Sequence, residues 1–341
     1  ISVKESTKNN LARVDYDGTA SSLLVEPERT NLLPYSSDFN SWYAQEDLTV
    51  DEHTSETTSP SGNNTASKVT ISGGGTDRRL YEPIITSSGS DYTFTLYAKK
   101  GTTDYIRFYL NSNIFDVSFD LTNGTKTVTV GSGSIESIGS DWYRLQATGT
   151  SSSTSQVPQI QLGTTASVND YLYIWGSQFE EGSYPTSLIP TDGGTVTRVK
   201  DQYSKTGISN LINSEEGVLF LEIAALSNDL SYRRISLNDS SVNNKVGISY
   251  DDVSNRIRGQ VVIGGVNIFL FFTSTDITEY SKIALKYKAN DFALWVDGFE
   301  RDTDISAGVL PSNTLNNLSF DNGGGGNNFF GKVKQLQVFK T

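Results

Sequence analysis

The sequence predicts an all-β protein with two β-sandwich domains. Ser, Thr, Gly and Asn dominate the chain, and segments with a helical period are nearly missing. Short runs with strand-like alternation are separated by turn signals such as Gly73–Gly75 and Asn123-Gly124. Repeated short strands of this kind are typical of sandwiches and jelly rolls, and 341 residues are enough for two domains that each bury a core.

The first half of the chain contains the eight strands that a jelly roll requires. We expect them over residues 66–71, 92–99, 105–111, 115–120, 126–130, 142–148, 159–162 and 171–175. Pro185 and Pro190 follow the last of them, and proline excludes a helix and favours extended chain. We therefore predict a jelly roll over residues 22–190, preceded over 1–21 by an N-terminal arm or the end of a preceding region.

The second half predicts a second sandwich over residues 217–341, after a connector over 191–216. Its expected strands are 217–226, 235–237, 246–250, 256–262, 267–273, 282–288, 291–296, 315–320 and 331–340. Ala289-Asn290 and Asp297-Gly298 are plausible tight turns, which predict two linked hairpins between 282 and 303. The final strand is expected to return to the sheet of the first.

Composition excludes several classes of function. The net charge of −12 disfavours binding to nucleic acid through phosphate neutralisation, and it equally disfavours an anionic membrane surface. No apolar run approaches the length of a transmembrane helix. Cysteine is absent, so there is neither a disulfide framework nor a thiolate metal site. The chain begins with Ile1, which favours a segment of a longer chain.

Two motifs flank the predicted jelly roll. The first is Leu23–Leu33 with Tyr35, Ser36, Phe39 and Trp42, and the second is Trp175–Glu180 with Gly182 and Thr186–Thr191. Together they resemble a module family found in structural proteins of phages that infect Bacteroidetes. The resemblance covers most of the chain. It implies a carbohydrate-binding-module-like jelly roll followed by a concanavalin A-like domain. Residues 197–223 resemble the opening of that domain. Residues 282–303 resemble its central hairpins, which are similar to those of laminin G domains.

The resemblance also implies a function. It suggests a non-enzymatic structural or attachment protein on the virion surface, in a tail fibre, a head fibre or a capsid-associated appendage. The expected partners are a host-surface polysaccharide, other virion proteins and further copies of the chain, without nucleic acid or membrane insertion. Two alternatives stay open: a polysaccharide depolymerase, either a glycoside hydrolase or a lyase, and a structural spacer without a ligand.

One strand offers residues suited to sugar recognition, which needs aromatic faces and planar polar groups. Tyr105, Arg107 and Tyr109 share one face of residues 105–111, while the opposite face is apolar and suits the core. We predict that this row contacts glycan, with Trp42 and Phe115 as flanking candidates. The alternative is that Tyr109 and Trp42 are ordinary core residues.

No catalytic residue is predicted. The single histidine, His53, lies in a polar loop, where a solvated side chain is expected. Glycosidases need two carboxyl groups at a set separation, but adjacent acids diverge on a strand. We therefore expect ordinary exposed acids at the two adjacent pairs, Glu180/Glu181 and Glu215/Glu216, and Glu222 stands alone among apolar residues.

No cofactor is assigned from the sequence, and the metal ligands stay unassigned. One histidine cannot form a histidine metal cluster. A structural calcium ion is possible, because acidic turns supply the hard oxygen ligands that calcium prefers. The candidate ligands are Asp297, Asp302, Asp304 and Asp321, and the alternative is that these turns are simply solvated.

Overall fold

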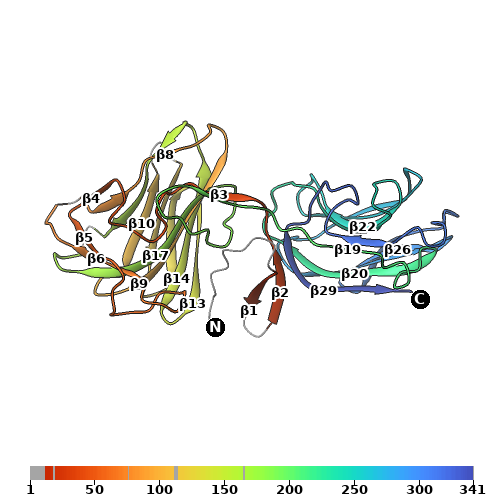
Figure 1. The fold of residues 1–341 in the computed structure, drawn as a ribbon, viewed down its shortest axis with the longest axis horizontal. Coiled ribbons are helices and arrows are strands. Elements are labelled where there is room, and N and C mark those ends of the chain that lie inside the picture. Colours follow the sequence, from red (N-terminus) through yellow and green to blue (C-terminus); the bar gives the residue numbers. More distant parts are fainter. Residues whose placement is uncertain (1–11, 18–19, 76, 111–113, 164–165, 341) are drawn as a thin grey trace. The chain divides into compact units, whose positions relative to one another are not determined.

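The computed structural model describes residues 12–17, 20–75, 77–110, 114–163 and 166–340 (Figure 1). Within these residues the regular secondary structure consists of strands, without a helix. The chain forms two compact units, which are described separately. The first unit is residues 28–199, and the second is residues 12–27 together with 200–340. The predicted fold class, all-β with two β-sandwiches, is confirmed.

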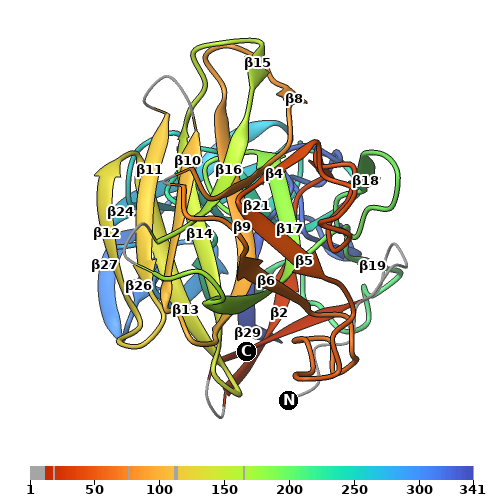
Figure 2. The ribbon, with the colours of Figure 1, turned by 90° about the vertical axis from the view of Figure 1, so that its left-hand side faces the viewer.

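The first unit contains two six-stranded antiparallel sheets, seen in Figure 2. The β9 sheet has the order β13-β14-β9-β17-β6-β5, and the β10 sheet has the order β12-β11-β10-β16-β7-β4. Two short pairs, β3 with β18 and β8 with β15, lie outside them. The bounds are β3 Arg29–Asn31, β4 Ala44–Glu46, β5 Leu48–Asp51, β6 Ser67–Ile71, β7 Arg79–Tyr81, β8 Ile84–Ile85, β9 Asp91–Lys100, β10 Tyr105–Leu110, β11 Phe115–Asp120, β12 Thr125–Val130, β13 Ser132–Gly139, β14 Trp142–Thr150, β15 Ser155–Gln156, β16 Pro158–Leu162, β17 Tyr171–Glu181 and β18 Val196–Arg198.

All eight predicted strands of this unit are present, as β6, β9, β10, β11, β12, β14, β16 and β17. The predicted end of one of them, Asn111, lies outside the described residues. Alternation decides which side chains fill the core: Ile106, Phe108 and Leu110 of β10 are fully buried, and so is Ile160 of the neighbouring β16. The core therefore lies against one face of the β10 sheet, and the opposite face points away from it.

The strand β17 is longer than predicted because it contains a β-bulge. Its register against β9 shifts between Trp175 and Gln178, and Gly176 adopts the left-handed backbone region at φ 63°. The bulge reverses the alternation of the strand. Before it, Ile174 points into the core, and after it Phe179 does, with both side chains fully buried.

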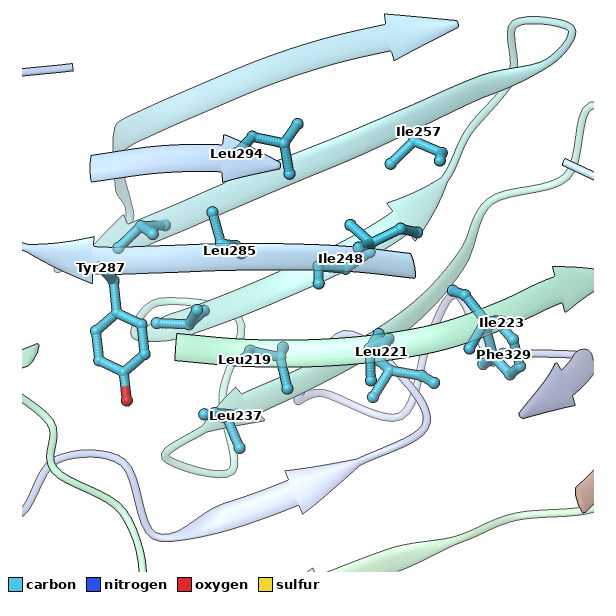
Figure 3. Packing of buried hydrophobic residues seen from close by; sticks show 14 of the residues in the cluster. Leu219, Leu221, Ile223, Leu237, Ile248, Ile257, Leu285, Tyr287, Leu294 and Phe329 are labelled. Atoms are coloured by element: carbon cyan, nitrogen blue, oxygen red, sulfur yellow. The ribbon is translucent and has the colours of Figure 1, made fainter. Parts of the chain in front are cut away.

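The second unit is also a sandwich of two antiparallel sheets. Its seven-stranded sheet has the order β1-β2-β29-β20-β25-β26-β27, and its six-stranded sheet has the order β19-β28-β21-β22-β23-β24. Leu219 and Leu221 of the first sheet pack against Leu237 and Ile248 of the second in the core shown in Figure 3. The bounds are β1 Arg13–Asp17, β2 Ala20–Val25, β19 Ser204–Thr206, β20 Glu216–Ala225, β21 Arg233–Asn238, β22 Lys245–Tyr250, β23 Arg256–Ile263, β24 Val266–Ser274, β25 Ser281–Lys288, β26 Phe292–Val296, β27 Phe299–Asp304, β28 Asn317–Ser319 and β29 Gly331–Phe339.

The predicted linked hairpins of this unit are present. The strands β25, β26 and β27 pair in series, and the turn residues Asn290, Asp297 and Gly298 have φ values of 59°, 54° and 83°. Positive φ at both central residues is the requirement of a type I′ hairpin turn, which Asp297-Gly298 satisfies. The final strand, β29, pairs with β20, so the predicted return to the first strand's sheet is confirmed.

The N-terminal boundary of the jelly roll needs correction. Residues 1–21 were expected as an arm and Ser22 as the start of the first domain, but β1 and β2 form a hairpin that extends the second unit's sheet. Leu23 pairs with Val333 of β29, and Val25 is fully buried in the second core. The motif that begins at Leu23 therefore contributes its first residues to the second unit and Arg29–Leu33 to the first.

The predicted connector over 191–216 is also shared between the units. Its residues up to Val199 include β18, which pairs with β3 of the first unit, and its later residues include β19, which pairs with β28 of the second.

The described residues include no helical segment that could span a lipid bilayer.

The assignment of β2 to the second unit can be tested with Val25→Asp. An unpaired carboxylate at this fully buried position should destabilise the second unit by about 3 kcal/mol or more. Hydrogen exchange should then lose protection in β20 and β29 while β9 and β10 keep theirs. The matched control is Val14→Asp on β1, where the side chain is half exposed and the change should have little effect. If protection is lost in β9 or β10 instead, β2 belongs to the first unit and the assignment is wrong.

Candidate functional site

The face of the β10 sheet that points away from the core carries a row of polar and aromatic side chains. Strand register places Arg107 of β10 beside Gln161 of β16, which in turn lies beside Arg79 of β7. The next row joins Tyr109, Gln159 and Tyr81 in the same way. We call this surface the tyrosine face, and it consists of Arg79, Tyr81, Tyr105, Arg107, Tyr109, Gln159 and Gln161.

Arg107 lies at the centre of the tyrosine face and is held on two sides. Its Nε and Nη2 donate to the two carboxylate oxygens of Asp116, each at 2.6 Å, and its Nη1 donates to Oε1 of Gln161 at 3.0 Å. Gln161 then donates to Gln159 at 2.7 Å. The hydrogen bonds with Asp116 raise the pKa of Arg107 further above its usual value. The guanidinium is therefore fixed in place before any ligand arrives.

Tyrosine rings extend this surface on both sides of Arg107. The Arg107 guanidinium lies 4.9 Å from the ring centre of Tyr109, and Tyr105 is 37% exposed with its hydroxyl 2.6 Å from that of Ser118. On the other side, Arg79 lies 5.0 Å from the ring centre of Tyr81, whose ring is 5.7 Å from that of Tyr43. Stacking rings alternate with planar donors and acceptors, an arrangement that suits the ring faces and hydroxyls of a sugar chain.

The structure places the other two predicted residues away from this face. Trp42 is only 3% exposed, its ring packs 5.4 Å from that of Phe39, and its indole nitrogen donates to the carbonyl of Tyr35. Phe115 is fully buried because it pairs with Leu110, which points into the core. Both are core residues and do not flank the tyrosine row. Trp42 is therefore an ordinary core residue, which was the alternative to a sugar contact. Tyr109 is not a core residue, since its ring lies on the outer face and is only partly buried.

Four members of the tyrosine face were missed by sequence reasoning. Gln159 and Gln161 alternate with Ile160 and Leu162, a pattern that shows which face of β16 is polar. It does not show that β16 lies beside β10, because that pairing joins residues far apart in the chain. Arg79 and Tyr81 lie on a strand too short to be recognised from alternation.

Two pairs of acidic side chains meet near the edge of the first unit. Partial burial, and to a smaller extent a hydrogen bond with Asp38, raise the pKa of Glu52. Partial desolvation and a hydrogen bond with Glu46 likewise raise the pKa of Asp77, while Arg79 lowers that of Glu46. Carboxyl groups that share a hydrogen bond are closer together than the roughly 5 Å or more that separates the two acids of a glycosidase.

The acids considered from sequence have other surroundings. Glu181 and Glu215 are exposed, and Glu216 forms an ion pair with Lys288 at 2.7 Å. Glu180 was expected to be exposed but is fully buried, because the bulge turns it toward the segment that follows β17. His53 is exposed and sits in a turn at φ 56°, in agreement with the expected loop position.

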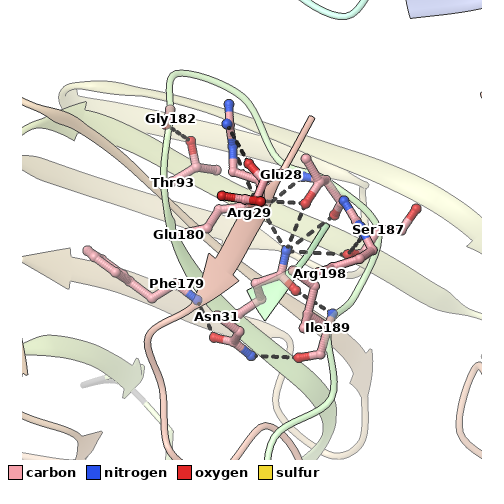
Figure 4. Close-up of polar contacts among 12 residues, drawn as sticks. Glu28, Arg29, Asn31, Thr93, Phe179, Glu180, Gly182, Ser187, Ile189 and Arg198 are labelled. Atoms are coloured by element: carbon pink, nitrogen blue, oxygen red, sulfur yellow. Dashed lines mark hydrogen bonds and ion pairs between the residues drawn. The ribbon is translucent and has the colours of Figure 1, made fainter. Parts of the chain in front are cut away.

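Glu180 belongs to a polar cluster that fixes the proline-rich segment after β17 (Figure 4). Its carboxylate accepts hydrogen bonds from the backbone N–H and hydroxyl of Thr186, at 2.8 and 2.7 Å, and from the amide of Gln178 at 2.6 Å. Arg29 lies 3.7 Å away. Burial nevertheless raises the pKa of Glu180. The Glu180 carboxylate thus satisfies buried donors of Gln178 and Thr186, as expected of a structural residue.

Asn31 completes the cluster and explains the pairing of the two sequence motifs. Its Nδ2 donates to the carbonyls of Ser177 and Ile189, and its Oδ1 accepts from the backbone N–H groups of Leu33 and Phe179. The side chain is fully buried and fully hydrogen-bonded. It therefore links the first motif to both halves of the second, as Figure 4 shows.

The candidate calcium ligands are engaged in turns. Asp297 accepts the backbone N–H of Lys282, Asp304 accepts that of Ser306, and Asp321 accepts that of Gly323. Across the described residues, no group of three or more His, Cys, Asp or Glu side chains could hold a metal ion.

Comparisons with known proteins identify no family. No protein-family model matches the sequence, and no curated protein does. Among solved structures, the chain is similar to domains LG4-5 of the mouse laminin alpha1 chain, at 11% sequence identity and a TM-score of 0.29. The match covers 79% of this chain and 88% of that one.

The structural role of Glu180 can be tested with Glu180→Ala. The change leaves the N–H and hydroxyl of Thr186 buried without an acceptor, which should destabilise the first unit by about 2–3 kcal/mol. Glu181→Ala is the matched control: it removes the adjacent, exposed acid and should change stability by less than about 0.5 kcal/mol. Tryptophan fluorescence during urea unfolding reports mainly on the first unit, which contains Trp42, Trp142 and Trp175. Equal stability of the two variants would contradict the structural role.

Proposed function

We propose that the chain is a non-enzymatic glycan-binding protein that uses the tyrosine face of the first unit. The observation that carries the proposal is the outward row of Tyr105, Arg107 and Tyr109, in register with the buried Gln159 and the partly exposed Gln161 of the neighbouring strand. Arg107 is fixed by Asp116 while its guanidinium and the flanking rings stay partly exposed. A preformed surface of this kind loses little conformational entropy when a sugar chain settles on it.

The shape of the site favours an extended chain over a small molecule. The face is one side of a sheet, so a ligand would lie across the strands. Two hollows lie elsewhere: one of about 10 Å³ beside Tyr287 in the second unit, and an open groove of about 500 Å³ beside Thr148 in the first. Contacts on an open face are individually weak, about 1 kcal/mol per stacked ring. Effective attachment would then require several copies of the site acting together.

The resemblance of the two motifs to phage structural proteins extends this proposal to a biological setting. We propose that the chain belongs to a virion appendage, such as a tail fibre or head fibre, and binds host-surface polysaccharide outside the cell. Such appendages are multimeric, so we also propose assembly with further copies or with other virion proteins. Multivalent display would supply the avidity that a weak single site lacks.

The acids of the described residues support a binding role more than a depolymerase. Glu180 is buried and committed to Thr186, and the pairs Asp38/Glu52 and Glu46/Asp77 are hydrogen-bonded within each pair. Neither arrangement leaves two carboxyl groups on opposite sides of a gap that could hold a glycosidic bond.

The binding role predicts the effect of the double variant Tyr105→Ala/Tyr109→Ala. Loss of two stacking rings should weaken glycan binding by about 2 kcal/mol, or roughly thirtyfold. A glycan array identifies the oligosaccharide, and biolayer interferometry then measures affinity for the folded variants. Tyr16→Ala is the control, because this tyrosine is 57% exposed on β1, outside the proposed face. Full binding by a folded double variant would place the site elsewhere.

The non-enzymatic role predicts that the full chain releases no reducing ends and no unsaturated products from the polysaccharide it binds. Product analysis by reducing-end assay and absorbance at the unsaturated uronate band measures both. Product formation that disappears with Glu222→Gln or Glu52→Gln would establish a depolymerase instead.

A further inference from the structure

The second unit carries three cationic side chains on the face of its six-stranded sheet that points away from the core. Arg234 of β21, Lys245 of β22 and Arg258 of β23 all share this face. The opposite alternation, with Ile235, Val246 and Ile257, fills the core. Strand register aligns Arg234, Ser249, Arg258 and Phe272 in one row across four neighbouring strands. We call this surface the cationic face.

None of these three cations forms an ion pair with any described residue. The Nη2 of Arg234 makes one long hydrogen bond, 3.4 Å to the hydroxyl of Ser249, and its Nε has no partner. The Nε of Arg258 and the Oε1 of the nearby Gln260 are also buried without a partner. Asp251, which follows β22, acts on Arg234 through its charge and raises the pKa of that guanidinium, but its carboxylate is held by Arg256 at 2.7 and 2.8 Å.

Burial makes this arrangement costly in the protein alone. Arg234 is 4% exposed and Lys245 is 6% exposed. Burial first, and then the charge of Arg258, lower the pKa of Arg234 to about 10, and burial followed by the two arginines lowers that of Lys245 to about 8. Buried cations are normally paired, so these two, which the partly exposed Arg258 also repels, favour an anionic partner.

The side chain of Arg234 packs closely over Gly247 at the centre of the cationic face. Gly247 lies between Lys245 and Ser249 on β22 and has no side chain there. A Cβ at this position would lie 3.2 Å from the Cδ of Arg234 and 3.5 Å from the Cβ of Ser236. The hydroxyl groups of Ser236 and Ser249 lie on the same side as the cations; that of Ser236 donates to the carbonyl of Asp321, and that of Ser249 accepts from Arg234.

We propose that the cationic face binds a carboxylate or sulfate group carried by an acidic polysaccharide. The cations supply the charge, and the exposed ring of Phe272, which lies 5.7 Å from the Arg258 guanidinium, supplies a surface for a sugar ring. This site is independent of the tyrosine face of the first unit.

Titration calorimetry on the full chain tests the proposal with three oligosaccharides of similar length. Oligogalacturonate presents carboxylates, a chondroitin sulfate oligosaccharide adds sulfates, and a cello-oligosaccharide is neutral. We expect one or both acidic probes to bind and the neutral one not to bind at this site. Lys245→Met and Arg258→Gln should each weaken the acidic probe about tenfold or more, because each removes a charge-assisted contact.

Two control variants make the result specific. Lys282→Met removes the same charge from an exposed position of the second unit and should leave affinity unchanged. Tyr16→Ala, at an exposed position of β1 outside both proposed faces, should also leave it unchanged. If Lys245→Met fails to fold, Arg258→Gln at its partly exposed position decides the question.

Three outcomes would overturn the proposal. The first is that neither acidic probe binds the unaltered chain. The second is that folded Arg258→Gln binds the acidic probe as tightly as the unaltered chain does. The third is that a polyglutamate peptide binds as tightly as the acidic oligosaccharides, since the site would then recognise carboxylates on protein and not a polysaccharide.

Discussion

The β-bulge at Gly176 is the constraint on which the first unit depends. Without the extra residue, the alternation of β17 would turn Gln178 and Glu180 into the core and Phe179 out of it. With it, Phe179 packs 5.3 Å from Tyr92 and 6.1 Å from Phe94, while the two polar side chains reach the segment around Thr186. A glycine is needed because its φ of 63° is disfavoured for residues with a side chain. One inserted residue thus allows a single strand to serve both an apolar core and a polar cluster.

This constraint changes the interpretation of the most recognisable sequence motifs. Their most distinctive polar residues, Asn31, Gln178 and Glu180, are buried, and they form hydrogen bonds with backbone groups, with each other and with the hydroxyl of Thr186. Leaving a buried polar group of this network without its hydrogen-bond partner would lower the stability of the fold. The network therefore specifies one path for the proline-rich segment. The motifs therefore describe how the unit is built. The proposed binding surface lies on the other sheet, where the sequence has no comparable signature.

Prediction from sequence succeeded where local alternation carries the information. The outward row on β10 follows from Ile106, Phe108 and Leu110 alone, and the hairpin turn at Asp297-Gly298 follows from its dipeptide. It failed where the answer depends on pairing between distant residues. The burial of Phe115 follows from its pairing with Leu110. Val25 belongs to the second unit because β2 pairs with β29, which lies more than 300 residues further along the chain. The bulge at Gly176 was missed because a glycine in a strand does not by itself indicate a change of register.

The two proposed surfaces differ in how their cations are neutralised, and this difference determines what each can bind. On the tyrosine face, Arg107 and Arg79 are paired with Asp116 and Glu46, so their charge is compensated and they act as rigid hydrogen-bond donors. Such a surface suits neutral hydroxyls and sugar ring faces. On the cationic face, Arg234 and Lys245 form no ion pair with another described residue, so the uncompensated charge itself is what a ligand would satisfy. An acidic polysaccharide carries hydroxyls, ring faces and anionic groups on one chain, and it is therefore a single class of ligand that meets the requirements of both surfaces.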